Sequence, residues 1–203
     1  MQHHFSSNLD LRSLILERKP KVIVECGAGD GSLTRKIAGL MSEYEFEFHV
    51  INDKEISGID DRIKWINGIS YRELEKFNDG SIDLCIIDTD HNYFTLGSEL
   101  KVLDRKIGEG GMVAMHDLET FYHDTGMAMS YWNDEVYPLN EINECAKSGS
   151  LGDALMDFLG ATRFRWKMLG YSRHSHGAAV IEKRLQTMFA IMAPGPKSVY
   201  AKT

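Results

Sequence analysis

The sequence is short of positive charge, of cysteine and of long apolar runs, and each shortage excludes a class of protein. Lysine and arginine total 23 against 30 aspartate and glutamate residues, a net charge of −7, whereas proteins that bind the nucleic-acid backbone carry a positive surface. No apolar run approaches the roughly 20 residues of a membrane helix. We therefore expect a protein that binds neither nucleic acid nor membrane.

The cysteines and the N-terminus indicate the compartment. Cys26, Cys85 and Cys145 are far apart and form no CxxC pair, which fits reduced thiols better than a disulfide framework. The first five residues lack the charged-then-apolar pattern of a signal peptide. On both grounds we expect a cytoplasmic protein.

The size and composition are those of one globular domain. The chain has 203 residues, of which 43% are hydrophobic. We expect the domain to span residues 1–183, with a lid or substrate-binding insertion at 118–162 and a tail at 184–203. The insertion is expected because these residues are rich in tyrosine, tryptophan and methionine and break the regular alternation of strands and helices.

Apolar segments typical of strands alternate with segments of helical periodicity. The expected strands are 22–24, 46–51, 63–66, 82–87, 112–115, 164–168 and 178–181. Near-continuous apolar strands joined by helices indicate a parallel sheet with helices on both faces, and the last two segments indicate an antiparallel hairpin. The expected fold class is α/β: a doubly wound, mostly parallel, seven-stranded sheet that ends in this hairpin.

Three element ends are also predicted. Asn8 is the expected N-cap of the first helix. Residues 71–77 have the pattern of a helix, and the glycines at 108–111 are expected to separate the preceding helix from the strand 112–115.

Polar side chains follow the carboxyl ends of the expected parallel strands. They are Glu25, Asp53, Ser70, Asp88, His91, His116 and Asp117. In open α/β sheets, ligands bind in the crevice at this edge. We therefore expect these side chains to form a site.

The glycine-rich segment after the first strand reads Glu-Cys-Gly-Ala-Gly-Asp-Gly (25–31). Ser32 stands where a dinucleotide fingerprint needs its third glycine, and the GK[ST] of a P-loop is absent. Glycines let the backbone approach a ligand closely, and the Glu25 carboxylate can accept hydrogen bonds from an ammonium group. Asp53 ends the second strand, where a carboxylate can hold ribose hydroxyls. The pattern favours nucleoside binding; the alternative is a plain strand-to-helix turn.

Here the sequence resembles the class I S-adenosylmethionine-dependent methyltransferases. Residues 22–31 look like their first motif, and Asn-Gly-Ile-Ser (67–70) lies where their adenine-contacting motif is found. The segments Ile-Asp-Thr-Asp-His-Asn-Tyr (87–93) and Gly-Gly-Met-Val-Ala-Met-His-Asp (110–117) are similar to the branch of cephalosporin-hydroxylase-like proteins and sugar O-methyltransferases. The resemblance implies a Rossmann-like methyltransferase fold and S-adenosylmethionine as cofactor. The cofactor-binding residues that it implies are Glu25, Gly27, Ala28, Gly29, Gly31, Asn52, Asp53, Gly68, Ser70 and Asp88.

The same resemblance implies a metal site. Several members of the branch hold a divalent cation with carboxylates at the ends of the fourth and fifth strands, which places the ligands here at Asp88, His116 and Asp117. Such a set can bind Mg²⁺ or Mn²⁺, although His116 stands where metal-dependent members have an acid and imidazole is a poor Mg²⁺ ligand. The alternative is that Asp117 caps the next segment and His116 is a buried core imidazole.

His91 stands where sugar O-methyltransferases of this branch place a general base. An imidazole with an ordinary pKa near 6.5 can take a proton from a hydroxyl at neutral pH. The resemblance therefore assigns His91 and Asp88 to catalysis. The alternative is that His91 orders the loop or contacts the cofactor.

The function implied is methyl transfer to a hydroxyl of a small molecule or sugar. Two alternatives stay open: a hydroxylase-like relative on the same fold, and a non-catalytic nucleoside-binding or scaffold subunit that uses an acidic amphipathic helix at 150–159 as an interface. The sequence names neither the acceptor nor the oligomeric state, so a homo-oligomer is also left open.

Overall fold

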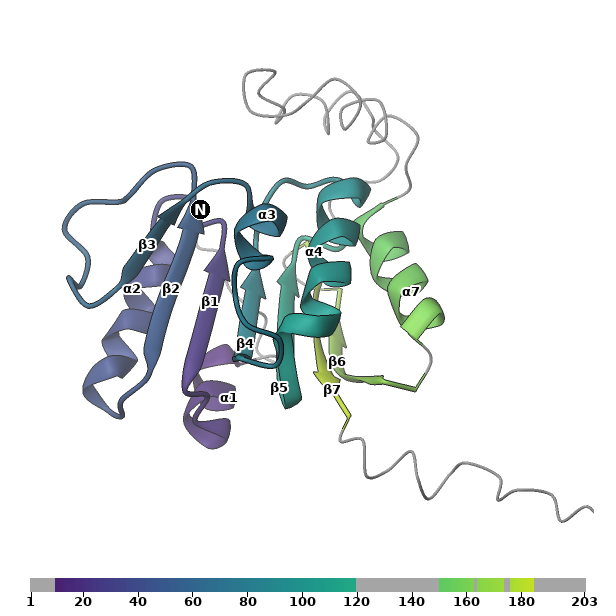
Figure 1. The fold of residues 1–203 in the computed structure, drawn as a ribbon, viewed down its shortest axis with the longest axis horizontal. Helices are drawn as coiled ribbons and strands as arrows, with labels where there is room; N and C mark the ends of the chain where they lie inside the picture. The colour runs from purple at the N-terminus through teal and green to yellow at the C-terminus, as the bar shows by residue number, and fades with distance from the viewer. Residues whose placement is uncertain (1–9, 120–149, 163, 174–175, 185–203) are drawn as a thin grey trace, which may run out of the picture.

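The computed structural model describes residues 10–119, 150–162, 164–173 and 176–184. Its centre is a seven-stranded sheet in the order β3-β2-β1-β4-β5-β7-β6 (Figure 1). The strands are β1 (Val22–Cys26), β2 (Glu47–Asn52), β3 (Lys64–Asn67), β4 (Ile82–Ile87), β5 (Ile107–His116), β6 (Trp166–Ser172) and β7 (Ala178–Lys183). The first five are parallel to one another, while β7 is antiparallel to both β5 and β6. The expected fold class is confirmed.

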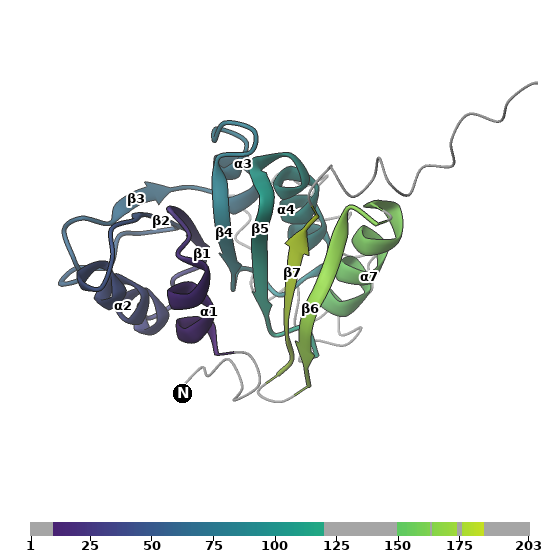
Figure 2. The same ribbon diagram turned by 90° about the horizontal axis from the view of Figure 1, so that it is seen from below.

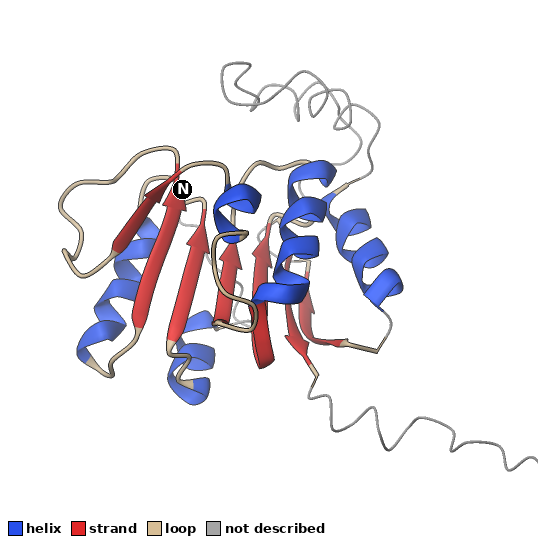
Figure 3. Ribbon diagram, viewed as in Figure 1, coloured by secondary structure: helices blue, strands red, loops and turns tan. Residues whose placement is uncertain are grey.

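Helices cover both faces of the sheet (Figures 2 and 3). The helices are α1 (Leu11–Arg18), α2 (Ser32–Gly39), the 3-10 turn η1 (Leu40–Ser42), α3 (Ser70–Leu74), α4 (Tyr93–Lys106) and α7 (Leu151–Thr162). The first three lie on one face, and α3, α4 and α7 lie on the other. Within the part of the chain that the structure describes, no helix is long and apolar enough to cross a membrane.

Two apolar cores, one on each face, follow from the alternation of side chains along the strands. Ile23 of β1 packs on the α1 and α2 side, whereas Val24 and Cys26 pack on the α4 side. Such two-sided burial is the reason why the strands are almost continuously apolar. It also places the side chain of Glu25, two residues after Ile23, on the α2 face.

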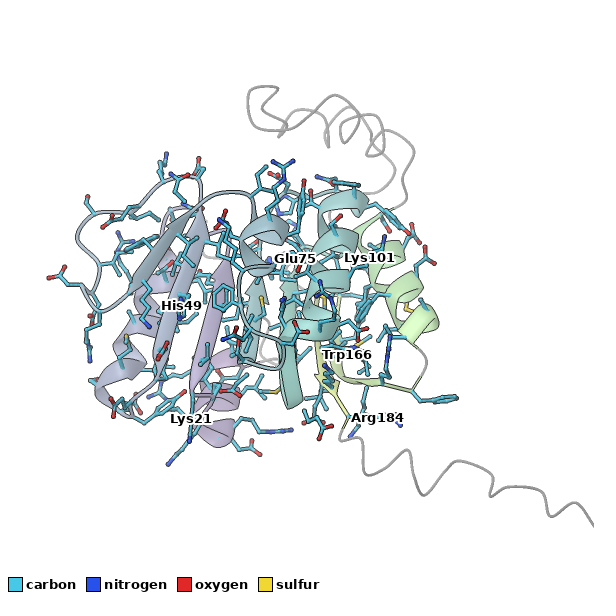
Figure 4. The ribbon with its side chains drawn as sticks, in the orientation of Figure 1. Lys21, His49, Glu75, Lys101, Trp166 and Arg184 are labelled. Atoms are coloured by element: carbon cyan, nitrogen blue, oxygen red, sulfur yellow. The ribbon has the colours of Figure 1, made fainter. Side chains whose placement is uncertain are left out.

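The amphipathic helix expected at 150–159 is α7, and its apolar side is part of the core. Leu151, Leu155 and Phe158 are buried together with residues of α4. The ring of Phe158 lies 5.5 Å from that of Trp166, which is labelled in Figure 4. The indole nitrogen of Trp166 donates to Asp104 Oδ1 at 2.8 Å. This face of α7 is therefore not a free docking surface.

Three element ends differ from the sequence-based prediction. The N-cap of α1 is Asp10, whose side chain accepts from the Ser13 amide at 3.2 Å, while Asn8 lies outside the described residues. Helix α3 ends at Leu74. Strand β5 begins at Ile107, because this buried residue pairs with Ile82 before the glycine segment and the register then shifts.

Several expectations fall largely outside the described residues. These are the insertion at 118–162, of which residues 120–149 are not described, and the tail from 185 onwards. Cys26 and Cys85 are buried and form no disulfide, as expected of reduced thiols, and Cys145 lies outside the described part.

Candidate functional site

The site lies where the order of the strands reverses. β1 has β2 on one side and β4 on the other, so the connections leave β1 and β4 toward opposite faces and open a crevice at their carboxyl ends. The loops that meet there follow β1, β2, β3, β4 and β5. These are the loops that carry the predicted polar residues.

The glycine loop packs tightly against the end of β4 at Gly27, whereas no other part of the described chain lies close to the side-chain position of Gly29. A Cβ on Gly27 would lie 2.1 Å from the Asp88 carbonyl oxygen and 3.0 Å from Thr89 Cα, whereas a Cβ on Gly29 would meet nothing within 4 Å. Both glycines have positive φ, 83° and 52°. Gly27 is therefore needed for packing, and Gly29 presents bare backbone to the crevice.

Asn52 ties the glycine loop to β2. Its Oδ1 accepts from the Ala28 amide at 3.1 Å and its Nδ2 donates to the Lys54 carbonyl at 2.8 Å. Gly31, with φ 77°, closes the loop as the N-cap of α2. Asn52 thus orders the loop with both ends of its amide, while the neighbouring Asp53 is exposed at the same edge.

Glu25 is buried at the base of this loop without a hydrogen-bond partner for either carboxylate oxygen among the described residues. It is 1% exposed. Burial raises the pKa of Glu25 to about 8, the Thr34 hydroxyl opposes this in part, and the charge of Asp88 adds to it. A buried carboxylate requires a cation or a proton. The position therefore favours a positively charged ligand group.

Ser70 lies at the start of α3 and is hydrogen-bonded to Glu99, a residue that was not predicted from the sequence. The Ser70 and Thr89 hydroxyls both donate to Glu99 Oε1, the second at 2.9 Å. Glu99 is 0% exposed. A signal was present, because position 99 follows Leu96 by three residues and so falls on the apolar side of α4. Gly68 precedes α3, and a Cβ on it would lie 2.7 Å from the Glu73 side chain.

Burial raises the pKa of Glu99 to about 8, the two hydroxyls oppose this in part, and the charge of Asp90 adds to it. Between its ordinary pKa of 4.5 and this value, the unfolded chain has released the proton that the folded chain retains. The free energy of unfolding is therefore expected to fall as pH rises, by at most about 1.4 kcal/mol per pH unit from this group.

Urea unfolding at about pH 5 and about pH 7.5 measures this dependence. Glu99→Gln removes the titrating group, so the variant is expected to lose less stability over the same interval. Identical pH dependence in wild type and variant would contradict a protonated Glu99.

Asp88, His91, His116 and Asp117 come together at the ends of β4 and β5. Asp117 Oδ2 lies 2.9 Å from His91 Nε2, and its Oδ1 lies 3.1 Å from His116 Nδ1. Asp88 Oδ1 lies 3.7 Å from His91 Nε2. Asp117 has the left-handed φ of 60°, which points its carboxylate between the two imidazoles at a backbone cost of about 1–2 kcal/mol.

The charges of this cluster are strongly coupled. Burial lowers the pKa of His91, but the nearby carboxylates of Asp117 and Asp88 outweigh burial and raise it to about 9. The pKa of His116 is also raised, since Asp117 outweighs burial there too. Burial opposes ionisation of Asp117, yet the two imidazoles hold its pKa well below the usual range. An ionised Asp117 therefore faces a protonated His91 at neutral pH.

Asp88, His116 and Asp117 can hold one cation. One donor atom from each residue lies within 4.8 Å of the other two, close to the separation of opposite ligands with bonds of about 2.1 Å. The set has two carboxylates and one imidazole, a donor set suited to Mn²⁺ and less suited to Mg²⁺. The three metal ligands named from the sequence thus lie close together at the ends of β4 and β5.

Known proteins share this fold and part of this sequence. Residues 24–118 match the family model described as a methyltransferase domain. No curated protein sequence matches the chain. An O-methyltransferase from Bacillus cereus in complex with SAH (S-adenosylhomocysteine) superposes with a TM-score of 0.60 at 13% identity, covering 91% of this chain and 84% of that one.

Two further solved structures are similar. SAH-bound methyltransferase PaMTH1 of Podospora anserina has a TM-score of 0.57 at 20% identity, covering 85% of this chain and 76% of that one. MycE methyltransferase from the mycinamycin biosynthetic pathway, in complex with Mg, SAH and mycinamycin VI, has a TM-score of 0.54 at 19% identity, covering 85% of this chain and 48% of that one. Residues 24–118 thus resemble a methyltransferase domain, and the chain has the fold of these solved methyltransferases.

Proposed function

We propose that the protein transfers a methyl group from S-adenosylmethionine to a hydroxyl oxygen of a small molecule or sugar. The observation that carries the proposal is Glu25, a buried acid without a hydrogen-bond partner among the described residues, beside a glycine loop that is open at Gly29. The ammonium group of the cofactor supplies the positive charge that such an acid requires. The exposed Asp53 at the same edge would accept hydrogen bonds from the ribose hydroxyls.

Calorimetric titration with S-adenosylhomocysteine tests the cofactor assignment. Wild type is expected to bind it, and Glu25→Gln to bind about tenfold more weakly, because the amide loses a charge-assisted hydrogen bond. Glu182→Gln is the matched control, since Glu182 pairs with Arg18 on the surface at 2.6 Å. A wild type that binds no S-adenosylhomocysteine would end the proposal.

The protein's own tasks in this reaction are positioning and proton removal, since the sulfonium already makes the methyl group electrophilic. The glycine loop, Asn52 and Ser70 would orient the cofactor, and the acceptor hydroxyl would approach past Asp88. A divalent cation bound by Asp88, His116 and Asp117 would lower the pKa of the acceptor hydroxyl. It would also offset the negative charge of Asp117.

His91 is the proposed general base. It lies within hydrogen-bond reach of Asp117, and the Asp117 and Asp88 carboxylates raise its pKa to about 9. It would therefore act as a base where a cation on these carboxylates, or a higher pH, leaves it neutral. His91→Gln is expected to keep the affinity for S-adenosylhomocysteine within about threefold and to lose methyl transfer. The measurement is S-adenosylhomocysteine release with hydroxylated acceptors. Undiminished transfer by the variant would remove the assignment.

A hydroxylase-like reaction is distinguished by the product. Methyl transfer adds a CH₂ unit to the acceptor, whereas hydroxylation adds one oxygen atom, so mass spectrometry of the acceptor separates the two reactions. We favour methyl transfer because the buried acid and the open glycine loop fit a cationic nucleoside.

A further inference from the structure

Glu99 joins two loops of the site through a single oxygen atom. Ser70 Oγ and Thr89 Oγ1 both donate to Glu99 Oε1. Ser70 opens α3 after β3, and Thr89 directly follows Asp88 after β4, so the two donors come from loops that are far apart in sequence. The strands β3 and β4 are not neighbours in the sheet, so strand pairing does not join these loops. The carboxyl is therefore a direct link between them.

The link is anchored in the core. Glu99 belongs to α4, whose Leu96, Leu100 and Leu103 are almost fully buried against the sheet. The helix therefore holds the carboxyl at a fixed place, and the hydroxyls adapt to it. We name Glu99, Ser70 and Thr89 the carboxyl clamp.

The carboxyl clamp also reaches the glycine loop. The space beside Gly27 is closed by the Asp88 carbonyl oxygen and by Thr89 Cα, 2.1 and 3.0 Å from where a Cβ would stand. A shift of Thr89 therefore moves the wall against which the glycine loop rests. Three loops that surround the crevice thus depend on one buried side chain.

We propose that Glu99 is a positioning residue for the cofactor: its carbonyl-type oxygen holds Ser70 and Thr89 in the arrangement that the nucleoside requires. The inference rests on the proposed cofactor. It assigns Glu99 no contact with the reacting atoms, and it predicts that loosening the carboxyl clamp weakens cofactor binding more than it weakens the fold.

If Glu99 is neutral, two substitutions of it, by glutamine and by leucine, should affect cofactor binding differently. Full burial and the nearby charge of Asp90 both favour the neutral carboxyl, whose acceptor oxygen a glutamine side chain reproduces. Glu99→Gln is therefore expected to bind S-adenosylhomocysteine within about threefold of wild type. Glu99→Leu has no acceptor and is expected to bind about tenfold more weakly or worse, since it leaves the buried Ser70 hydroxyl and the half-buried Thr89 hydroxyl without their acceptor.

Thr89→Val tests the clamp without touching Glu99, and Thr89 is not one of the residues assigned to the cofactor. The loss of one hydrogen bond is expected to weaken S-adenosylhomocysteine binding about three- to tenfold. In the Glu99→Leu background the same substitution is expected to have almost no further effect, because the bond it removes is already gone.

Two controls separate positioning from general destabilisation. Thr162→Val removes a buried hydroxyl bond of similar length, 2.8 Å to the Phe158 carbonyl, far from the crevice. Leu103→Ala opens a cavity beneath the same helix α4. Both are expected to lower the melting temperature and to keep the affinity for S-adenosylhomocysteine within about twofold.

Calorimetry and thermal unfolding of full-length variants test the inference. Wild-type affinity in both Thr89→Val and Glu99→Leu would overturn it and leave the proposed cofactor intact, whereas a wild type that binds no S-adenosylhomocysteine would overturn both. Equal weakening by Glu99→Gln and Glu99→Leu would also refute the acceptor role. If Glu99→Leu does not fold, the comparison of Thr89→Val with Thr162→Val still distinguishes positioning from destabilisation.

Discussion

Replacing Gly29 with alanine is expected to weaken S-adenosylhomocysteine binding by about a hundredfold or more while leaving the fold almost unchanged. A Cβ at this position meets no protein atom within 4 Å, so the methyl group projects into the space where the proposed cofactor would lie against bare backbone. Forcing a methyl group into such a contact costs up to about 3 kcal/mol, which is on the order of a hundredfold in affinity. The positive φ of 52° adds a backbone cost of about 1–2 kcal/mol.

Replacing Gly27 is expected to damage both binding and stability. Its Cβ would stand 2.1 Å from the Asp88 carbonyl oxygen, and the atoms that it meets are backbone atoms of Asp88 and Thr89, which cannot rotate away. Overpacking of about 1–3 kcal/mol adds to the strain of a left-handed alanine, for a total loss of about 3 kcal/mol or more. Urea unfolding and calorimetry on the two variants measure the contrast.

Gly110→Ala is the matched control for Gly29→Ala. Gly110 also has a positive φ, 77°, and also has nothing within 4 Å of its would-be Cβ, but it lies in β5 away from the crevice. It is expected to lose the same small amount of stability and to keep full affinity. Wild-type affinity in Gly29→Ala would show that the cofactor does not pass this loop.

Asp117→Asn is expected to weaken Mn²⁺ binding by about a hundredfold or more. Asp117 is one of the three residues whose donor atoms lie within 4.8 Å of one another, and changes even outside the ligand set of a metal commonly cost about ten- to a hundredfold. Asparagine is a suitable replacement, because it is nearly isosteric and tolerates the left-handed backbone with φ 60°. The variant therefore removes charge and ligand strength without a new backbone strain.

Electron paramagnetic resonance of Mn²⁺ titrated into the protein measures the affinity directly, without an acceptor. Asp90→Asn is the control, because it removes an equal charge close to Asp88 but lies outside this group of three. We expect it to bind Mn²⁺ nearly as wild type does. A wild type without measurable Mn²⁺ affinity, or Asp117→Asn with unchanged affinity, would show that Asp117 serves only the two histidines.

The position of His91 shows what a motif leaves undecided. The motif suggests a general base of ordinary pKa, whereas the structure sets its Nε2 between Asp117 and Asp88 and raises its pKa to about 9. The difference arises because Asp117 is 26 residues further along the chain and meets His91 only through the pairing of β4 with β5. Whether a carboxylate faces an imidazole is not encoded within either segment.

By itself, the sequence determined the layers of the sheet, the antiparallel end and the edge at which the polar residues gather. These properties follow from short-range periodicity and from the rule that parallel strands end at the same edge. Only the tertiary structure decided which glycine is closed and which is open, that Glu99 holds two distant loops, and that Asp117 lies between two histidines. The physical reason is that these contacts join atoms brought together by strand order and side-chain direction, and a local pattern contains neither.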